Sequence, residues 1–185
     1  MNIRAFSLVS FLSLAAAGGA LRAADAAASP GPVTVLLRNV HMCCGSCVKD
    51  ADQAVATVPG AEALADLYSK SVIITAPDHA TAQRAIDTLA NAGYYGTPTD
   101  AAYAFKPAAD MKETKVTAAT LTGVHLCCKK CVTAATNALA TVKGVKTNTA
   151  AEDADSFEVT GEFDPHEVIA ALNKAGFTGR IAAKP

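Results

Sequence analysis

Apolar positions along the chain alternate between two spacings, one typical of strands and the other of helices. Residues 33–40 are rich in β-branched and other apolar side chains and predict a strand. The next apolar residues are spaced i, i+3, i+7 and i+10, so they lie on one face of a predicted helix: Val48, Ala51, Val55 and Val58. Pro59-Gly60 ends this helix.

The next 45 or so residues, to Phe105, predict two more strands, a second helix and a final strand. We expect the strands at 61–67, 71–76 and 95–105 and the helix at 79–91. The resulting order, βαββαβ, is the split βαβ or ferredoxin-like arrangement. The predicted fold class is therefore α+β, with a four-stranded antiparallel sheet that carries two helices on one face.

The same residue pattern occurs twice in the chain. Residues 41–47 read His-Met-Cys-Cys-Gly-Ser-Cys, and residues 125–131 read His-Leu-Cys-Cys-Lys-Lys-Cys, at an offset of 125 minus 41, or 84. Later, Ala92-Gly93-Tyr94 matches Ala175-Gly176-Phe177 at an offset of 83. Because self-similarity at a fixed offset indicates a duplicated structural unit, we expect two tandem ferredoxin-like domains.

The duplication sets the predicted domain boundaries. The first domain covers 33–105 and the second 115–185; they are joined by a linker, 106–114, that has no apolar period and holds a proline. In the second domain we expect strands near 116–124, 144–151, 155–161 and 178–182, and helices near 131–141 and 165–174. Asp164 is the expected N-cap of the last helix, with Pro165 in its first turn.

The N-terminal residues have the pattern of a secretory signal peptide. Arg4 supplies the positive charge expected near the N-terminus of a signal peptide, and residues 5–14 are mostly apolar. Ala24-Asp25-Ala26 is a candidate cleavage site. We predict a signal peptide over 1–26 and a disordered lead-in over 27–32. The protein is then exported, with the periplasm as the expected compartment, and it has no stable membrane insertion after cleavage, since the apolar run is shorter than the ~20 residues that span a bilayer.

Charge and cysteine content narrow the class of function. A formal net charge of −1 with 18% charged residues excludes a nucleic-acid partner held by bulk positive charge. Disulfide frameworks usually distribute their cysteines to join distant segments. Here the six cysteines instead form two clusters of three: Cys43, Cys44 and Cys47, then Cys127, Cys128 and Cys131.

Each cluster contains a C-x-x-C pair placed between a predicted strand and a predicted helix. These pairs, Cys44 with Cys47 and Cys128 with Cys131, are the primary candidate metal ligands. Backbone N–H groups at a helix start favour thiolates, and paired thiolates select soft metals. Copper(I) is the leading candidate cofactor, with zinc(II) and mercury(II) as alternatives. Lys129-Lys130 further predicts that the second pair ionises before the first.

These residues resemble the heavy-metal-associated domain of copper chaperones, of metal-transporting P-type ATPases and of the periplasmic mercury-binding protein. Met42 matches the family's core methionine, which Leu126 replaces in the second copy; Tyr94 and Phe177 match an aromatic loop position near the cysteine pair. The resemblance implies βαββαβ domains, metal bound by the C-x-x-C pairs, and a metal-transporting ATPase or another metal-binding protein as partner.

Both loops also depart from the family pattern. His41 and His125 stand where the family has glycine, and Cys43 and Cys127 stand where it has a small hydroxyl residue. Each loop thus offers a Cys3His set, compatible in type with tetrahedral zinc(II). Cys43 and Cys127 are candidate third thiolates or half-buried small residues. His41 and His125 are candidate ligands, hydrogen-bond donors to a ligand, or plain strand-end residues.

Three functions compete at this point. The leading hypothesis is an exported metal chaperone, scavenger or buffer with no catalytic chemistry, which binds metal through two Cys-rich loops. The second is an enzyme, a thiol-disulfide oxidoreductase that uses C-x-x-C. The third is a structural or regulatory module that metal locks into its fold.

Overall fold

The computed structural model describes residues 30–106 and 115–182. The predicted signal peptide, 1–26, lies outside the described residues, as does the predicted linker apart from Lys106. Among the described residues, no helix is both long and apolar enough to cross a bilayer.

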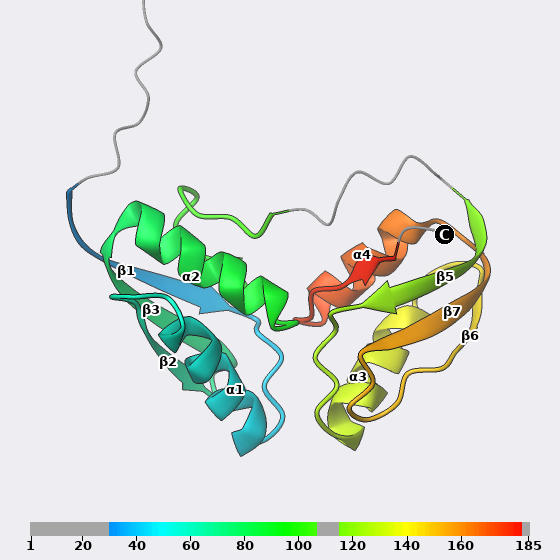
Figure 1. Ribbon diagram of the computed structural model, residues 1–185. Coiled ribbons are helices and arrows are strands. Elements are labelled where there is room, and N and C mark those ends of the chain that lie inside the picture. Colours follow the sequence, from blue (N-terminus) through cyan, green and yellow to red (C-terminus); the bar gives the residue numbers. More distant parts are fainter. Residues whose placement is uncertain (1–29, 107–114, 183–185) are drawn as a thin grey trace, which may run out of the picture.

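The two halves of the chain have the same architecture (Figure 1). The first domain contains β1 (Pro30–Arg38), α1 (Gly45–Ala56), β2 (Glu62–Asp66), β3 (Ser71–Asp78), α2 (His79–Asn91) and β4 (Thr97–Pro98). The second contains β5 (Val116–Thr122), α3 (Lys129–Ala140), β6 (Val145–Asn148), β7 (Ser156–Phe163), α4 (Pro165–Lys174) and β8 (Arg180–Ile181). The antiparallel strand orders are β2-β3-β1-β4 and β6-β7-β5-β8, which confirms two ferredoxin-like α+β domains.

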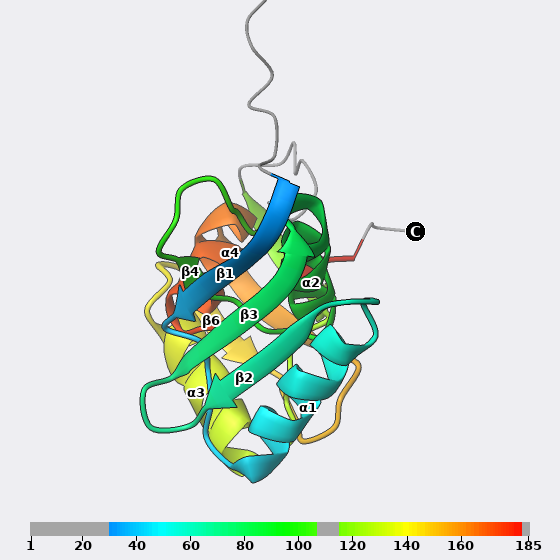
Figure 2. The same cartoon turned by 90° about the vertical axis from the view of Figure 1, so that its left-hand side faces the viewer.

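Each sheet has one buried face and one exposed face. In β3, Val72, Ile74 and Ala76 are buried, whereas Ile73 and Thr75 between them are exposed. This alternation is the period of a strand with one face against the core. Figure 2 shows β1, β3 and β2 side by side across the outer side of the first domain.

Helix α1 turns a cysteine toward the core. Its buried residues are Cys47, Ala51 and Val55, which recur at i, i+4 and i+8 and so form one stripe. Val48, which the sequence pattern placed on this stripe, is only half-buried. Helix α3 repeats the arrangement with Cys131, Ala135 and Leu139. One cysteine of each C-x-x-C pair is therefore held by core packing.

Several element bounds differ from the prediction. Strand β1 begins at Pro30, inside the predicted lead-in, because Pro30 pairs with Asp78 of β3. The predicted strand 95–105 is wrong: β4 is only Thr97–Pro98, after which the chain turns at Asp100 and packs its Tyr103 ring on His79. Helix α4 matches its prediction, with Pro165 in the first turn and Asp164 accepting a hydrogen bond from the His166 N–H.

The two domains meet at the loops that follow α2 and α4 (Figure 1). The contacts are reciprocal: the Tyr95 N–H donates to the Gly176 carbonyl at 3.0 Å, and the Thr178 N–H donates to the Gly93 carbonyl at 3.0 Å. The two glycines have φ of +91° and +89°, a region that favours glycine.

These same glycines allow the histidine loops to come close. A Cβ on Gly93 would lie 2.4 Å from the backbone nitrogen of His125, and a Cβ on Gly176 would lie 2.4 Å from that of His41. Each glycine therefore lets a loop of one domain approach the cysteine loop of the other. The result is that the two cysteine loops face each other.

Candidate metal centre

Each cysteine loop connects the end of a strand to the start of a helix. Cys44 and Cys128 are the N-cap residues of α1 and α3, with extended backbones at φ of −160° and −166°. Beneath the loops, Met42 and Leu126 are buried, with 3% and 4% of their surface exposed. The position at a helix start and the buried residue below it agree with the sequence analysis.

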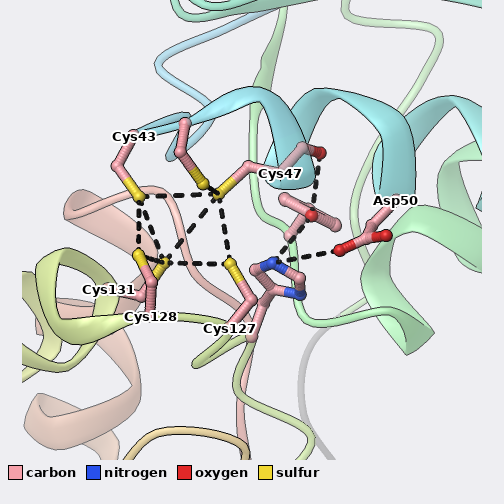
Figure 3. Close-up of polar contacts among 9 residues, drawn as sticks. Cys43, Cys47, Asp50, Cys127, Cys128 and Cys131 are labelled. Atoms are coloured by element: carbon pink, nitrogen blue, oxygen red, sulfur yellow. Dashed lines mark hydrogen bonds and ion pairs between the residues drawn. The ribbon is translucent and has the colours of Figure 1, made fainter.

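The six cysteines are all free and gather in one cluster between the domains (Figure 3). The Sγ atoms of Cys43 and Cys128 lie 3.3 Å apart, and those of Cys43 and Cys131 lie 3.4 Å apart. Cys47 Sγ lies 3.5 Å from Cys127 Sγ and 3.9 Å from Cys131 Sγ. All four contacts cross from one domain to the other. They are longer than a disulfide bond of about 2.05 Å, so these are neighbouring thiols.

Sulfurs of the same loop also converge. Cys44 Sγ lies 3.7 Å from Cys47 Sγ, and Cys128 Sγ lies 3.7 Å from Cys131 Sγ. Cys43 and Cys47 are separated by 3.6 Å. The sequence predicts one separate site in each loop. The structure instead combines both loops in a single cluster, because the domain interface brings together residues that are about 84 positions apart.

Three sets of side chains bring their ligand atoms within 4.8 Å of one another. They are Cys47 with His125, Cys127 and Cys131; His41 with Cys43 and Cys131; and Cys43 with Cys44 and Cys128. Every set contains residues of both domains. All eight residues that the sequence singled out as candidate ligands occur in at least one set.

The ring of His125 is held by an aromatic residue of the other domain. The Tyr94 hydroxyl donates to the Cys47 carbonyl at 2.9 Å and lies 3.0 Å from His125 Nε2. The two rings are also in contact, with centroids 4.5 Å apart, and burial raises the pKa of Tyr94. Asp50 Oδ2 lies 3.9 Å from the same His125 nitrogen. Tyr94 therefore connects the backbone of one cysteine loop to the histidine of the other.

The corresponding ring of His41 lacks such a partner. It stacks on Phe177 with centroids 4.2 Å apart, but phenylalanine has no hydroxyl. His41 Nε2 is buried and has no hydrogen-bond partner among the described residues. Burial lowers the pKa of His41, so the imidazole is held neutral, the form that binds metals. A buried nitrogen without a partner is costly unless something binds it.

The close sulfurs shift one another's pKa values. The hydrogen bond from Cys131 lowers the pKa of Cys47, and donation of that bond raises the pKa of Cys131. The pKa of Cys128 is lowered to about 7, chiefly by the backbone N–H of Cys131. Burial raises the pKa of Cys43 and Cys127.

The expectation from Lys129-Lys130 that the second pair ionises first concerns each loop by itself, and for the isolated loops it stays a prediction. In the assembled cluster the pKa is lowered for one thiol of each loop, Cys47 and Cys128. The hydrogen bond that lowers the pKa of Cys47 comes from the other domain, whereas the side chains of Lys129 and Lys130 are exposed to solvent. The cluster as a whole can lose protons to become a set of thiolate ligands, and a metal that binds there displaces the remaining protons.

Thiols gathered at the starts of two helices in a ferredoxin-like protein define a metal-binding class of protein. Residues 123–178 match the family described as the heavy-metal-associated domain. This part of the chain, which lies within the second domain, belongs to that family of heavy-metal-binding modules, so the resemblance found in the sequence is confirmed for the second domain. No curated protein matches the chain.

Solved structures that match this chain include two from Bacillus subtilis. The N-terminal soluble domains of CopA share 15% identity over 83% of this chain and 95% of that one, with a TM-score of 0.29. The water-soluble region of the P-type ATPase CopA shares 18% identity over 81% and 91%, also with a TM-score of 0.29. The first two RRM domains of yeast poly(U)-binding protein share 11% identity over 82% and 100%, with a TM-score of 0.23. Superpositions this loose have no bearing on function.

Proposed function

We propose that this protein binds a soft metal ion at the cluster of six cysteines and acts as a metal chaperone, scavenger or buffer. The observation that carries this proposal is the convergence of free thiols from both loops, with sulfurs of the two domains 3.3 to 3.9 Å apart. Sulfurs that converge at these distances can act together as ligands of one soft ion.

Copper(I) is the ion that we favour. A soft monovalent ion prefers thiolates, and several thiolates at contact distance allow it to pass from one sulfur to the next by ligand exchange. The Cys3His set formed by Cys47, His125, Cys127 and Cys131 also suits zinc(II) in ligand type, and mercury(II) is a further thiophilic competitor.

We further propose that the first domain is a diverged second copy of the family and that the protein is exported to the periplasm. The repeated His-x-Cys-Cys-x-x-Cys motif and the identical strand orders support the duplication. The apolar residues 5–14 and the Ala24-Asp25-Ala26 sequence support export. The proposed partner is a metal-transporting ATPase or another metal-binding protein, which would accept the ion through thiolates of its own.

The test is an anaerobic titration of the reduced mature chain, followed by native mass spectrometry, with copper(I) and zinc(II) in competition. We expect copper(I) to be retained in preference to zinc(II). The double variant Cys47→Ser/Cys131→Ser should lose most of the bound metal, while Ser46→Ala, in the exposed part of the same loop, should bind as the parent does. Metal-free turnover of a disulfide substrate, with no retained copper, would instead favour a thiol-disulfide oxidoreductase.

A further inference from the structure

The ligand sets that lie deepest in the cluster do not follow the C-x-x-C pairs. The first set takes Cys47 from α1 and adds His125, Cys127 and Cys131 from the second domain. The second set takes His41 and Cys43 from the first domain and adds Cys131. Neither set contains Cys44 or Cys128, although each of these belongs to a C-x-x-C pair. Each set is complete only when both domains are present.

The two sets also share one sulfur. Cys131 is a member of both, it is fully buried, and its Sγ lies 3.4 Å from Cys43 and 3.9 Å from Cys47 (Figure 3). A thiolate has several lone pairs and can bind two soft ions at once. The position of Cys131 between the two sets is the position of a bridging ligand.

The histidines complete the two sets from opposite sides. His125 belongs to the first set and His41 to the second. The buried Nε2 of His41, which has no hydrogen-bond partner among the described residues, is an independent sign that this set is built for a ligand. Because the sets lie side by side and are each completed by an imidazole, they can hold two ions rather than one.

Cys44 and Cys128 lie at the outer edge of the cluster. They line a shallow surface hollow together with Lys129, Lys130 and Glu152. With Cys43 they form the third set, which shares Cys43 with the second. These two sulfurs are therefore reachable from the hollow, and Cys43 connects them to the deeper positions.

On this basis, and resting on the proposed function, we infer that the protein holds two metal ions between its domains, bridged by Cys131. One ion is bound by Cys47, His125, Cys127 and Cys131, and the other by His41, Cys43 and Cys131. Cys44 and Cys128 serve to load and release metal rather than to retain it. The adjacent cysteines of each Cys-Cys pair thus have different roles.

The experiment compares neighbouring cysteines in the full mature chain, anaerobically loaded with copper(I) and challenged with a competing chelator. We expect Cys43→Ser and Cys127→Ser each to lose one of two tightly held ions. Cys44→Ser and Cys128→Ser should keep both, with affinities within about threefold of the parent, and should exchange metal more slowly. Only variants whose circular dichroism matches the parent's are compared, and Cys127→Ala is made beside Cys127→Ser so that loss of the ligand is separated from a new hydroxyl.

A second measurement tests the shared sulfur directly. With the thiophilic probe cadmium(II), enriched in ¹¹³Cd, two NMR resonances should appear and should show scalar coupling to each other through the Cys131 sulfur. Two uncoupled resonances would overturn the bridge. Loss of ions in Cys44→Ser and Cys128→Ser, with none lost in Cys43→Ser or Cys127→Ser, would assign one ion to each C-x-x-C pair and overturn the inference while leaving the proposed function intact. A parent protein that retains no copper(I) would contradict the proposed function itself.

Discussion

The hydroxyl of Tyr94, in the first domain, lies 3.0 Å from Nε2 of His125, in the second. The same hydroxyl donates to the Cys47 carbonyl, so one side chain fixes a cysteine loop of its own domain and a histidine of the other. The corresponding pair, Phe177 and His41, keeps the ring stacking but lacks the hydrogen bonds. The two halves of the interface are therefore similar in shape and different in chemistry.

The substitution Tyr94→Phe should lower the free energy of unfolding of the metal-free protein by about 1 to 3 kcal/mol, because it leaves the buried Cys47 carbonyl and His125 nitrogen without this partner. Urea unfolding measures the effect. Tyr95→Phe is the matched control, since no hydrogen bond of the Tyr95 side chain is present among the described residues and only a small change is expected. Equal effects of the two substitutions would show that the Tyr94 hydroxyl contributes no net stability.

The glycines of the interface should not tolerate a side chain. In Gly93→Ala the new Cβ would lie 2.4 Å from the His125 backbone nitrogen, and φ is +91°. We expect the new side chain to force the domains apart and to weaken the retention of metal. The free energy of unfolding should fall by at least about 1 kcal/mol, which is the lower end of the usual cost of a strained backbone conformation. Gly45→Ala is the control, because no atom lies within 4 Å of its Cβ. Unchanged retention of copper(I) in Gly93→Ala would contradict a site shared between the domains.

His41 should make the metal-free protein less stable in acid. Its pKa is lowered by burial from 6.5 in the unfolded chain, so between the two pKa values the unfolded state binds more protons than the folded state. The free energy of unfolding must then decrease as the pH falls below about 6.5. The His41→Gln variant should show a shallower decrease between pH 7 and 5 when unfolding is followed by urea titration. Parallel curves for variant and parent would exclude this contribution.

Mild oxidation should join the two loops. Cys43 and Cys128 have the closest sulfurs in the cluster, at 3.3 Å. With diamide, the two thiols give up two hydrogens to the oxidant, which becomes a hydrazine, and a disulfide forms across the domains. Proteolytic digestion and mass spectrometry should find a peptide from each loop linked in one product.

The oxidation has two controls. Prior loading with copper(I) should protect the thiols from diamide, because metal-bound sulfurs are not free to attack. In the Cys43→Ser variant, the peptide pair joined by a disulfide between residue 43 and Cys128 should be absent. If only Cys44–Cys47 and Cys128–Cys131 bridges form, the loops do not meet in solution as they do in the structure.

Much of each domain could be predicted from the sequence because its signals are local. The alternation in β3 and the Asp164-Pro165 start of α4 are set by neighbouring residues, and both appear as expected. The prediction of a strand over 95–105 is wrong because an apolar residue of this segment packs elsewhere. Tyr103 is buried against α2 instead of pairing in the sheet. A pattern of apolar positions records that a residue is buried, but not which element covers it.

The sequence by itself determined the internal repeat, the fold of each domain and the eight candidate ligand side chains, because these follow from repeated motifs and from residue chemistry. Only the tertiary structure decided that the two loops form one cluster. That result depends on Gly93 and Gly176, whose missing side chains let each domain approach the histidine loop of the other. Contacts between surfaces of two separate domains have no periodicity along the chain, so Cys47 and Cys131, both buried in their own helices, could be recognised as neighbours only in three dimensions.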